Sequence, residues 1–210
     1  MNGHECYVIG AGDFYGLREI PDDSDYVIAA DAGYKYCREA GLIPDLVLGD
    51  FDSLGDIPEH PNTVKLPAEK DDTDMLFALK LGIEKGYRHF FIYGGTGGRR
   101  PDHGVANLQC LLYLANRGCR GWLFGENEVW TVIKNSALRL RGSGTVSVFC
   151  IDGGASGVSL RGLKYPLENA SVAPDFPIGV SNELAGGDAE ISVLSGSLLV
   201  MYSKDIGETD

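Results

Sequence analysis

The chain has 210 residues, a formal net charge of −12 and 44% hydrophobic residues. This composition is typical of a folded protein with a sizeable core, and it excludes an intrinsically disordered chain. The sequence has no apolar run long enough to span a membrane and no signal peptide at its N-terminus, so we expect a cytoplasmic protein without a membrane partner.

The acidic excess is concentrated in one stretch of the chain. Residues 13–74 carry 16 acidic and 5 basic side chains, whereas the rest of the chain is close to neutral. Such a surface would repel a phosphate backbone, which predicts that nucleic acid is not a partner. A solvated acidic face and a set of carboxylates that converge on a divalent metal ion are both open interpretations.

The cysteines suggest neither a zinc site nor a disulfide framework. They are odd in number and contain no CxxC pair. The five are Cys6, Cys37, Cys110, Cys119 and Cys150. Cys6, Cys110 and Cys150 lie in apolar runs, so we expect these three to be core thiols of a reducing compartment.

Short apolar runs alternate with helical patterns over the first part of the chain. Strands are predicted over residues 6–9, 26–30, 46–48, 63–66, 89–93 and 121–124. Helices are predicted over residues 34–40, 73–85 and 103–116. Such βα units predict an N-terminal α/β domain with a mostly parallel sheet over residues 1–134.

After residue 134 the pattern changes to short β-like runs separated by Gly, Ser, Pro and Asn. The runs cover residues 138–141, 145–150, 158–160, 189–194 and 197–203. Ser195 and Gly196 separate the last two runs, which predicts a β-hairpin. Residues 135–210 are therefore predicted to form an all-β domain, a small antiparallel sandwich or barrel.

The first chemical motif follows the apolar run 46–48. Asp50 and Asp52 are separated by one residue, so both carboxylates are expected at the carboxyl edge of the sheet, where open α/β folds bind ligands. Carboxylate oxygens are ligands that a hard cation such as Mg²⁺ prefers. An ordinary Asp-rich turn is the alternative interpretation.

The second motif is an acidic run at the start of the helix predicted over residues 73–85. Asp71, Asp72 and Asp74 place three carboxylates within four positions. These repel one another unless a cation, solvent or a helix N-terminus offsets their charge. Capping of the helix by Asp71 or Asp72 is the simpler interpretation, and it leaves Thr73 and Asp74 available to a metal ion or a phosphate.

The third motif is rich in glycine. Four glycines lie within residues 94–98, and Arg99 and Arg100 follow them. A backbone without side chains can approach a phosphate chain, the arginines add positive charge, and a helix begins directly afterwards. The run lacks the ending of a Walker loop, and a flexible connection with two solvated arginines is the alternative. The role of His103 stays open.

Two further runs lie in the C-terminal part, GLKYPL at 162–167 and GVSNE at 179–183. From spacing alone they are turn residues around a partly buried tyrosine. Together with GDFDS at 49–53, KDDTD at 70–74 and GGTGGRRPDH at 94–103, however, they resemble in order the motifs of the thiamine pyrophosphokinase family. The match covers most of the chain and involves several independent motifs.

The resemblance implies an N-terminal nucleotide-binding α/β domain, a C-terminal β-sandwich and a homodimer with thiamine bound at the subunit interface. It also implies transfer of pyrophosphate from ATP to thiamine, which gives thiamine diphosphate and AMP. ATP is anionic, so an acidic site requires a cation to bind it, and Mg²⁺ is the cation that the resemblance implies.

The resemblance further implies the residues of the site. The magnesium ligands would be Asp50, Asp52 and Asp74, and the catalytic residues would be Asp71, Asp102 and Arg100. Asp71 would be a further ligand or a base toward the thiamine hydroxyl. The contacts to ATP and thiamine would be Asp31, Ser53, Thr73, Arg99, Tyr165, Ser181 and Asn182. The chain departs from the family in the added Arg99 and in Tyr165, which stands where many members have Trp.

Two other functions are compatible with the same motifs. A Mg²⁺-dependent kinase or phosphohydrolase for another small alcohol or phosphate ester would use the same carboxylates. A binding module without catalysis is the non-enzymatic alternative. The nucleotide product separates them, because thiamine-dependent formation of AMP requires pyrophosphoryl transfer.

Overall fold

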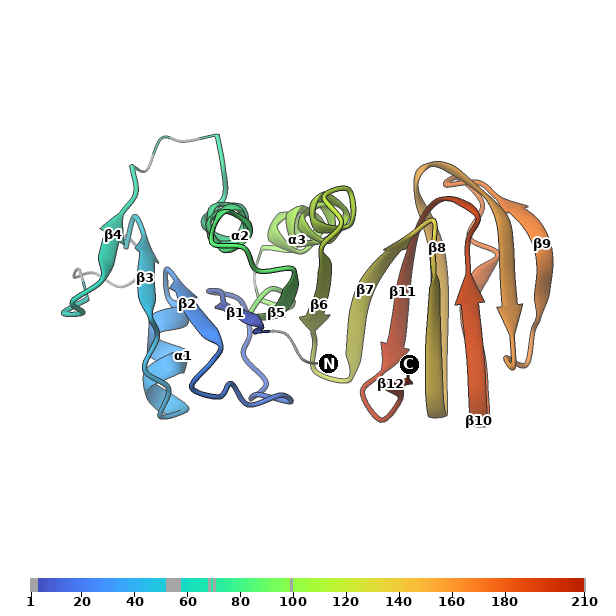
Figure 1. The fold of residues 1–210 in the computed structure, drawn as a ribbon, viewed down its shortest axis with the longest axis horizontal. Helices are drawn as coiled ribbons and strands as arrows, with labels where there is room; N and C mark the ends of the chain where they lie inside the picture. The colour runs from blue at the N-terminus through green and yellow to red at the C-terminus, as the bar shows by residue number, and fades with distance from the viewer. Residues whose placement is uncertain (1–3, 52–57, 68, 70, 99, 210) are drawn as a thin grey trace. The chain divides into compact units, whose positions relative to one another are not determined.

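The structure is a computed structural model that describes residues 4–51, 58–67, 69, 71–98 and 100–209. The chain divides into two compact units, Met1–Glu126 and Asn127–Asp210, and Figure 1 shows their elements. The sequence placed the division eight residues later, after residue 134. The difference arises because strand β7 (Glu128–Lys134) pairs along its whole length with a strand of the second unit, β11 (Ser195–Ser203).

The first unit is built on parallel strands. They are β1 (Cys6–Ile9), β2 (Tyr26–Ala30), β3 (Leu46–Gly49), β4 (Thr63–Lys65), β5 (His89–Tyr93) and β6 (Arg120–Phe124). Their order in the sheet is β6-β5-β1-β2-β3-β4, and each neighbouring pair is parallel. All four residues of β1 are buried, as expected for a central parallel strand with both faces covered.

Three helices connect strands of the first unit within the described residues. They are α1 (Gly33–Glu39), α2 (Asp74–Glu84) and α3 (Pro101–Ala115). Helices α2 and α3 lie side by side in Figure 1. Each turns its apolar face to the sheet, where Leu79 and Leu114 are fully buried. No helix in the described part of the chain is long and apolar enough to cross a membrane.

The second unit contains only strands among its described residues. Besides β7 and β11 they are β8 (Ala137–Arg161), β9 (Leu167–Val172), β10 (Gly179–Ser192) and β12 (Gly207–Thr209). The long strand β8 pairs with β9, β10, β11 and β12. Ile191 of β10 lies opposite both Leu138 and Leu160, so the two ends of β8 flank the same strand.

The predicted β-hairpin around Ser195 is wrong. Strand β11 pairs with β7 on one side and with β8 on the other, so neither of its edges is available to β10. The three runs predicted within residues 138–160 also form one continuous strand. Gly142 and Gly144 have φ angles of 137° and 146°, and glycine allows the strand to bend there without ending.

All five cysteines are free and buried. The sequence predicted core thiols at Cys6, Cys110 and Cys150, and Cys37 and Cys119 are buried as well. Burial raises the pKa of the Cys37 and Cys110 thiols to about 12. These side chains are therefore neutral at physiological pH and act as small apolar core residues rather than as nucleophiles.

Candidate active site

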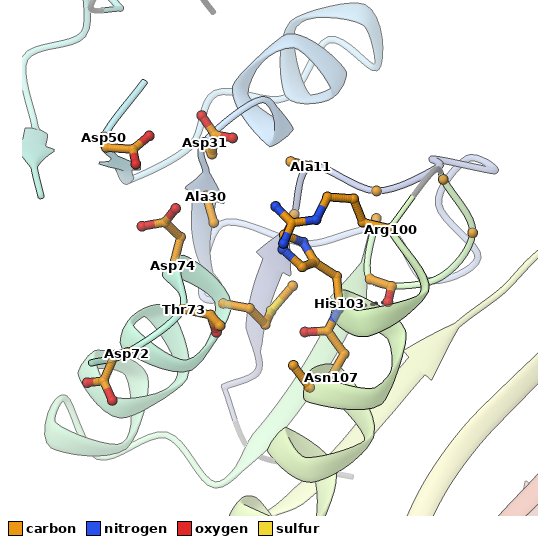
Figure 2. A pocket seen from close by; sticks show the side chains of 18 residues that line it. Ala11, Ala30, Asp31, Asp50, Asp72, Thr73, Asp74, Arg100, His103 and Asn107 are labelled. Atoms are coloured by element: carbon orange, nitrogen blue, oxygen red, sulfur yellow. Dashed lines mark hydrogen bonds between the residues drawn. The ribbon is translucent and has the colours of Figure 1, made fainter. Parts of the chain in front are cut away.

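A cavity of about 460 Å³ lies at the carboxyl ends of strands of the first unit (Figure 2). It is lined by residues that follow β1, β2, β3 and β5 and by the first turns of α2 and α3. From β1 the sheet continues in one direction to β2, β3 and β4 and in the other to β5 and β6. The cavity therefore lies at the point where the strand order reverses, which is where open α/β sheets bind ligands.

One side of the cavity is acidic. Asp31, Asp50, Asp72 and Asp74 line it, and Figure 2 shows Asp31, Asp50 and Asp74 near one another. The backbone of Asp31 has a φ of 52°, which is uncommon for a residue other than glycine and is found at functional sites. The amide of Asp31 donates to the carbonyl oxygen of Leu48 at 2.7 Å, and this bond ties the end of β2 to β3.

Neither Asp71 nor Asp72 is the N-cap of α2, whereas the simpler interpretation of the acidic run suggests that one of them is. Thr73 is the N-cap, and its hydroxyl oxygen accepts the amide hydrogen of Leu76 at 3.1 Å. Both carboxylate oxygens of Asp72 contact the Lys80 Nζ, at 2.6 and 2.7 Å, and this hydrogen bonding raises the pKa of Lys80. Thr73 and Asp74 line the cavity, whereas Asp71 is exposed and does not.

The other side of the cavity is formed by two glycine-rich loops. The β1 loop, residues 10–13, follows strand β1, and the β5 loop, residues 94–98, follows strand β5. Gly12 donates its amide hydrogen to the Gly94 carbonyl oxygen at 2.7 Å. A Cβ atom on Gly12 would lie 2.7 Å from that oxygen, so the close approach of the loops requires glycine there.

Helix α3 contacts the β5 loop, and its N-cap residue Arg100 adds a positive charge to the site. The buried Asn107 donates from Nδ2 to the Gly95 carbonyl oxygen at 2.7 Å. Arg100 lines the cavity and pairs with Asp102, with 2.6 Å between Nη2 and Oδ2. This hydrogen bonding lowers the pKa of Asp102. Asp102 itself is exposed and does not line the cavity.

The site residues expected in the second unit lie close together in that unit. Asn182 is buried, and its side chain accepts from the Tyr165 amide at 2.9 Å and donates to the Tyr165 carbonyl oxygen at 2.7 Å. The ring of Tyr165 is exposed. Ser181 is also exposed and has a φ of 56°. The side-chain amide of Asn182 therefore fixes the backbone of Tyr165. The neighbouring residue Ser181 has a backbone conformation that is uncommon outside glycine.

Three of the expected residues, Asp52, Ser53 and Arg99, lie outside the described residues. Within the ranges that the structure describes, no group of three His, Cys, Asp or Glu side chains is close enough to hold a metal ion. The first unit thus brings five of the expected residues to one cavity, with carboxylates on one side and glycines with an arginine on the other. The five are Asp31, Asp50, Thr73, Asp74 and Arg100.

Two models of protein families match this chain. The catalytic domain of thiamin pyrophosphokinase matches residues 17–123, and the vitamin B1 binding domain of thiamin pyrophosphokinase matches residues 136–198. The chain belongs to the thiamin pyrophosphokinase family. The enzymes of this family transfer pyrophosphate from ATP to thiamine. The two matched regions fall within the two compact units of the structure.

Individual thiamin pyrophosphokinases are similar over nearly the whole chain. The thiamine pyrophosphokinase of Bacillus subtilis is 29% identical over 207 residues, which cover 89% of this chain and 94% of that protein. A crystal structure of thiamine pyrophosphokinase from Bacillus subtilis superimposes with a TM-score of 0.85 at 26% identity, covering 96% of this chain and 99% of that chain. The thiamin pyrophosphokinase of Geobacillus thermodenitrificans gives a TM-score of 0.82 at 29% identity, covering 96% and 98%.

Three contributors to the cavity were not among the site residues expected from the sequence. They are residues 10–12, Asp72 and Asn107. The run Gly-Ala-Gly directly after the first strand was a signal for a close backbone approach. Asn107 lies four residues after His103, which also lines the cavity, and this spacing places both on one helix face.

Proposed function

We propose that this chain converts thiamine and ATP to thiamine diphosphate and AMP in the cavity of the first unit. The observation that carries the proposal is the composition of that cavity, which has carboxylates on one side and amide-rich glycine loops with Arg100 on the other. A polyphosphate requires both kinds of group, because cations held by carboxylates and N–H donors neutralise different oxygens.

The proposal includes Mg²⁺ held by Asp50, Asp52 and Asp74. The donor chemistry fits, because Asp50 and Asp74 line the same cavity and offer the carboxylate oxygens that Mg²⁺ prefers. Asp52, two residues after Asp50, enters the proposal from the sequence alone. When bound, Mg²⁺ neutralises phosphate oxygens and orients them for in-line attack. Asp31 lies on the same acidic side of the cavity, and we propose that it also contacts the nucleotide.

The phosphate chain is proposed to bind at the glycine loops. The guanidinium of Arg100 offers several N–H donors to phosphate oxygens, and Asp102 holds that guanidinium by the ion pair of 2.6 Å. Arg99 enters the proposal as a second arginine from the sequence alone. The paired carboxylate of Asp102 is an acceptor only, so its role here is to orient Arg100.

The thiamine hydroxyl is proposed to lose its proton to Asp71 or to a neighbouring carboxylate. Thr73 supports this part of the site by capping α2, which fixes the first turn that carries Asp74. Ser53 enters the proposal as a residue of the motif that carries Asp50 and Asp52. Exchange of Asp71 and of Asp72 for Asn, one at a time, tests this assignment, because loss of the base is expected to lower kcat, to remove the acidic limb of its pH profile and to leave the affinity for ATP unchanged.

Thiamine is proposed to bind at Tyr165, Ser181 and Asn182, at the interface of a homodimer. The exposed ring of Tyr165 supports this, because an aromatic face can stack on a cationic ring. The role of Asn182 follows from its hydrogen bonds, which hold the Tyr165 backbone in place. Exposed apolar side chains close by in the sequence, Phe176 and Ile178, support a subunit interface in this region.

The second unit is proposed to be a two-layer β-sandwich and the first an α/β domain, and the pairing of β10 with both ends of β8 supports the folding of one sheet onto itself. The cytoplasm is the proposed compartment, and the five free, buried cysteines support a reducing one.

Separation of ATP, ADP and AMP by HPLC after incubation with Mg²⁺ tests the function. We expect AMP to form in equal amount with thiamine diphosphate, and only when thiamine is present. Formation of ADP or of free phosphate without AMP would instead support a kinase or a phosphohydrolase. Omission of Mg²⁺ with added EDTA is the matched control, and we expect it to abolish turnover.

A further inference from the structure

The two glycine-rich loops of the cavity continue the sheet beyond the ends of its strands. The pairing of β1 with β5 ends at Ile9 and Tyr93. Past that point Gly12 donates to the Gly94 carbonyl oxygen at 2.7 Å, and the Asp13 amide donates to the Thr96 carbonyl oxygen at 3.1 Å. Backbone hydrogen bonds from the β1 loop therefore fix the first half of the β5 loop.

The second half of the β5 loop is held by a side chain. The Gly98 amide donates to Oδ2 of Asp13 at 2.7 Å. Gly97 and Gly98 have φ angles of 69° and 75°, and two successive left-handed glycines have little conformational preference of their own. A Cβ atom on Gly97 would lie 2.5 Å from Asp13 Oδ2, so the carboxylate packs directly against this turn.

The loop that Asp13 holds is the one that leads to the cationic side chain of the cavity. Gly97, Gly98 and Arg100 all line the cavity, whereas Asp13 does not. Because Asp13 takes the Gly98 amide hydrogen, that amide is not a donor for phosphate. What Asp13 determines is the position of the residues on either side of Gly98.

We infer that Asp13 is a positioning residue for the phosphates of ATP, which acts by fixing the turn at Gly97 and Gly98 and so the approach of Arg100 to the cavity. The inference rests on the proposed function for the identity of the ligand. It assigns a role to the oxygen atom of Asp13 as a hydrogen-bond acceptor, and none to its negative charge. A carboxylate close to a polyphosphate is electrostatically unfavourable, so the charge opposes binding.

Exchange of Asp13 for Asn removes the negative charge and keeps a hydrogen-bond acceptor, so two variants at this position separate the two properties. In Asp13→Asn the side-chain oxygen still accepts from the Gly98 amide, whereas Asp13→Ala removes this acceptor and with it the longer contact of 3.4 Å with the Tyr15 hydroxyl. Loss of one such hydrogen bond corresponds to about a ten-fold weaker interaction. We expect Asp13→Ala to raise KM for ATP about ten-fold, with kcat and KM for thiamine within two-fold of the wild type. Asp13→Asn is expected to bind ATP at least as tightly as the wild type.

A second readout separates this inference from the proposed function. The Kd of a non-hydrolysable ATP analogue with Mg²⁺ is measured by calorimetry for the same variants, with Asp23→Ala as the matched exposed control. If the wild type makes no AMP but the Kd depends on Asp13 as described, the function is wrong and the positioning role stands. If the wild type makes AMP and Asp13→Ala binds ATP and analogue normally, the positioning role is wrong.

Two further outcomes are also decisive. Equal weakening by Asp13→Asn and Asp13→Ala would overturn the inference, because it would show that the charge of Asp13, for example as a metal ligand, is what matters. Circular-dichroism melting of each variant establishes that it is folded. If Asp13→Ala melts early, Asp13→Ser provides the same truncation with a polar side chain, and the same ratio to Asp13→Asn is expected.

Discussion

Asp50 and Asp74 are 24 residues apart in the chain, yet both line one cavity. Asp50 is placed there by the end of β3 and Asp74 by the first turn of α2. Asp72, two residues before Asp74, lines the same cavity, but both of its carboxylate oxygens contact the Lys80 Nζ, at 2.6 and 2.7 Å. Neighbouring carboxylates of one acidic run are thus in different electrostatic environments, and we expect their exchange to have different effects.

Exchange of Asp50 or Asp74 for Asn is therefore expected to lower kcat/KM by about 100-fold or more, because each change removes an anionic oxygen from the proposed metal site. The melting temperature should remain close to that of the wild type. Steady-state AMP formation and circular dichroism check both statements. Asp23→Asn, an exchange at an exposed position, is the control, and wild-type kinetics in a folded Asp50→Asn variant would contradict the assignment.

Strand bounds were predicted most accurately from the sequence where a strand is buried on both faces of the sheet. The strands predicted over residues 26–30 and 89–93 have those bounds in the structure, because continuous apolar runs between turn signals leave few alternatives. Partner choice was less predictable. The error at Ser195 and Gly196 arose because local turn chemistry does not show that β7 and β8 already occupy both edges of β11.

In the candidate site, too, local sequence patterns predicted the motifs but did not predict the contacts between distant segments. Its motifs lie at strand ends and helix starts, which periodicity locates, so their position at the carboxyl edge of the sheet could be predicted from the sequence, and Asp50, Asp74 and Arg100 all line the cavity there. The contact of the β1 loop with the β5 loop joins residues more than 80 positions apart. Only the register of β1 with β5 brings them together, and a single sequence does not contain that information.

The first turn of α2 depends on its cap. We expect Thr73→Ala to destabilise the protein by about 1 kcal/mol, because the Leu76 amide loses its acceptor. Chemical denaturation measures this loss. Because the same turn carries Asp74, kcat/KM should also fall, whereas Thr73→Ser should retain both stability and activity. A Thr73→Ala variant with unchanged unfolding free energy would contradict the capping role.

Exchange for Ala at two glycines of the site region is expected to change the stability of the protein in opposite directions. In Gly12→Ala the new Cβ would lie 2.7 and 2.9 Å from carbonyl oxygens of the β5 loop, so we expect a loss of stability of about 1–3 kcal/mol and weaker ATP binding. A Cβ on Gly104, within α3, meets nothing within 4 Å. Gly104→Ala is expected to stabilise by up to about 1 kcal/mol. Denaturation curves with the same sign for both would contradict this account of the loops.

In the proposed function each of the two compact units binds one of the two substrates. The cavity that is proposed to bind ATP is formed within Met1–Glu126. Tyr165, Ser181 and Asn182 belong to Asn127–Asp210, which contains the region that matches the vitamin B1 binding domain. The two binding functions should therefore be separable by mutations, and a change in the second unit should alter thiamine binding more than ATP binding.

Exchange of an exposed apolar residue of the second unit tests the proposed homodimer. Ile178 is 52% exposed, and a charge placed there would be desolvated if this face is a subunit interface. We expect the wild type to sediment as a dimer and Ile178→Asp as a monomer with a KM for thiamine at least ten-fold higher, because burying an unpaired charge costs several kcal/mol. The Kd of the ATP analogue should stay unchanged. A fully active Ile178→Asp monomer would show that thiamine binds within a single subunit.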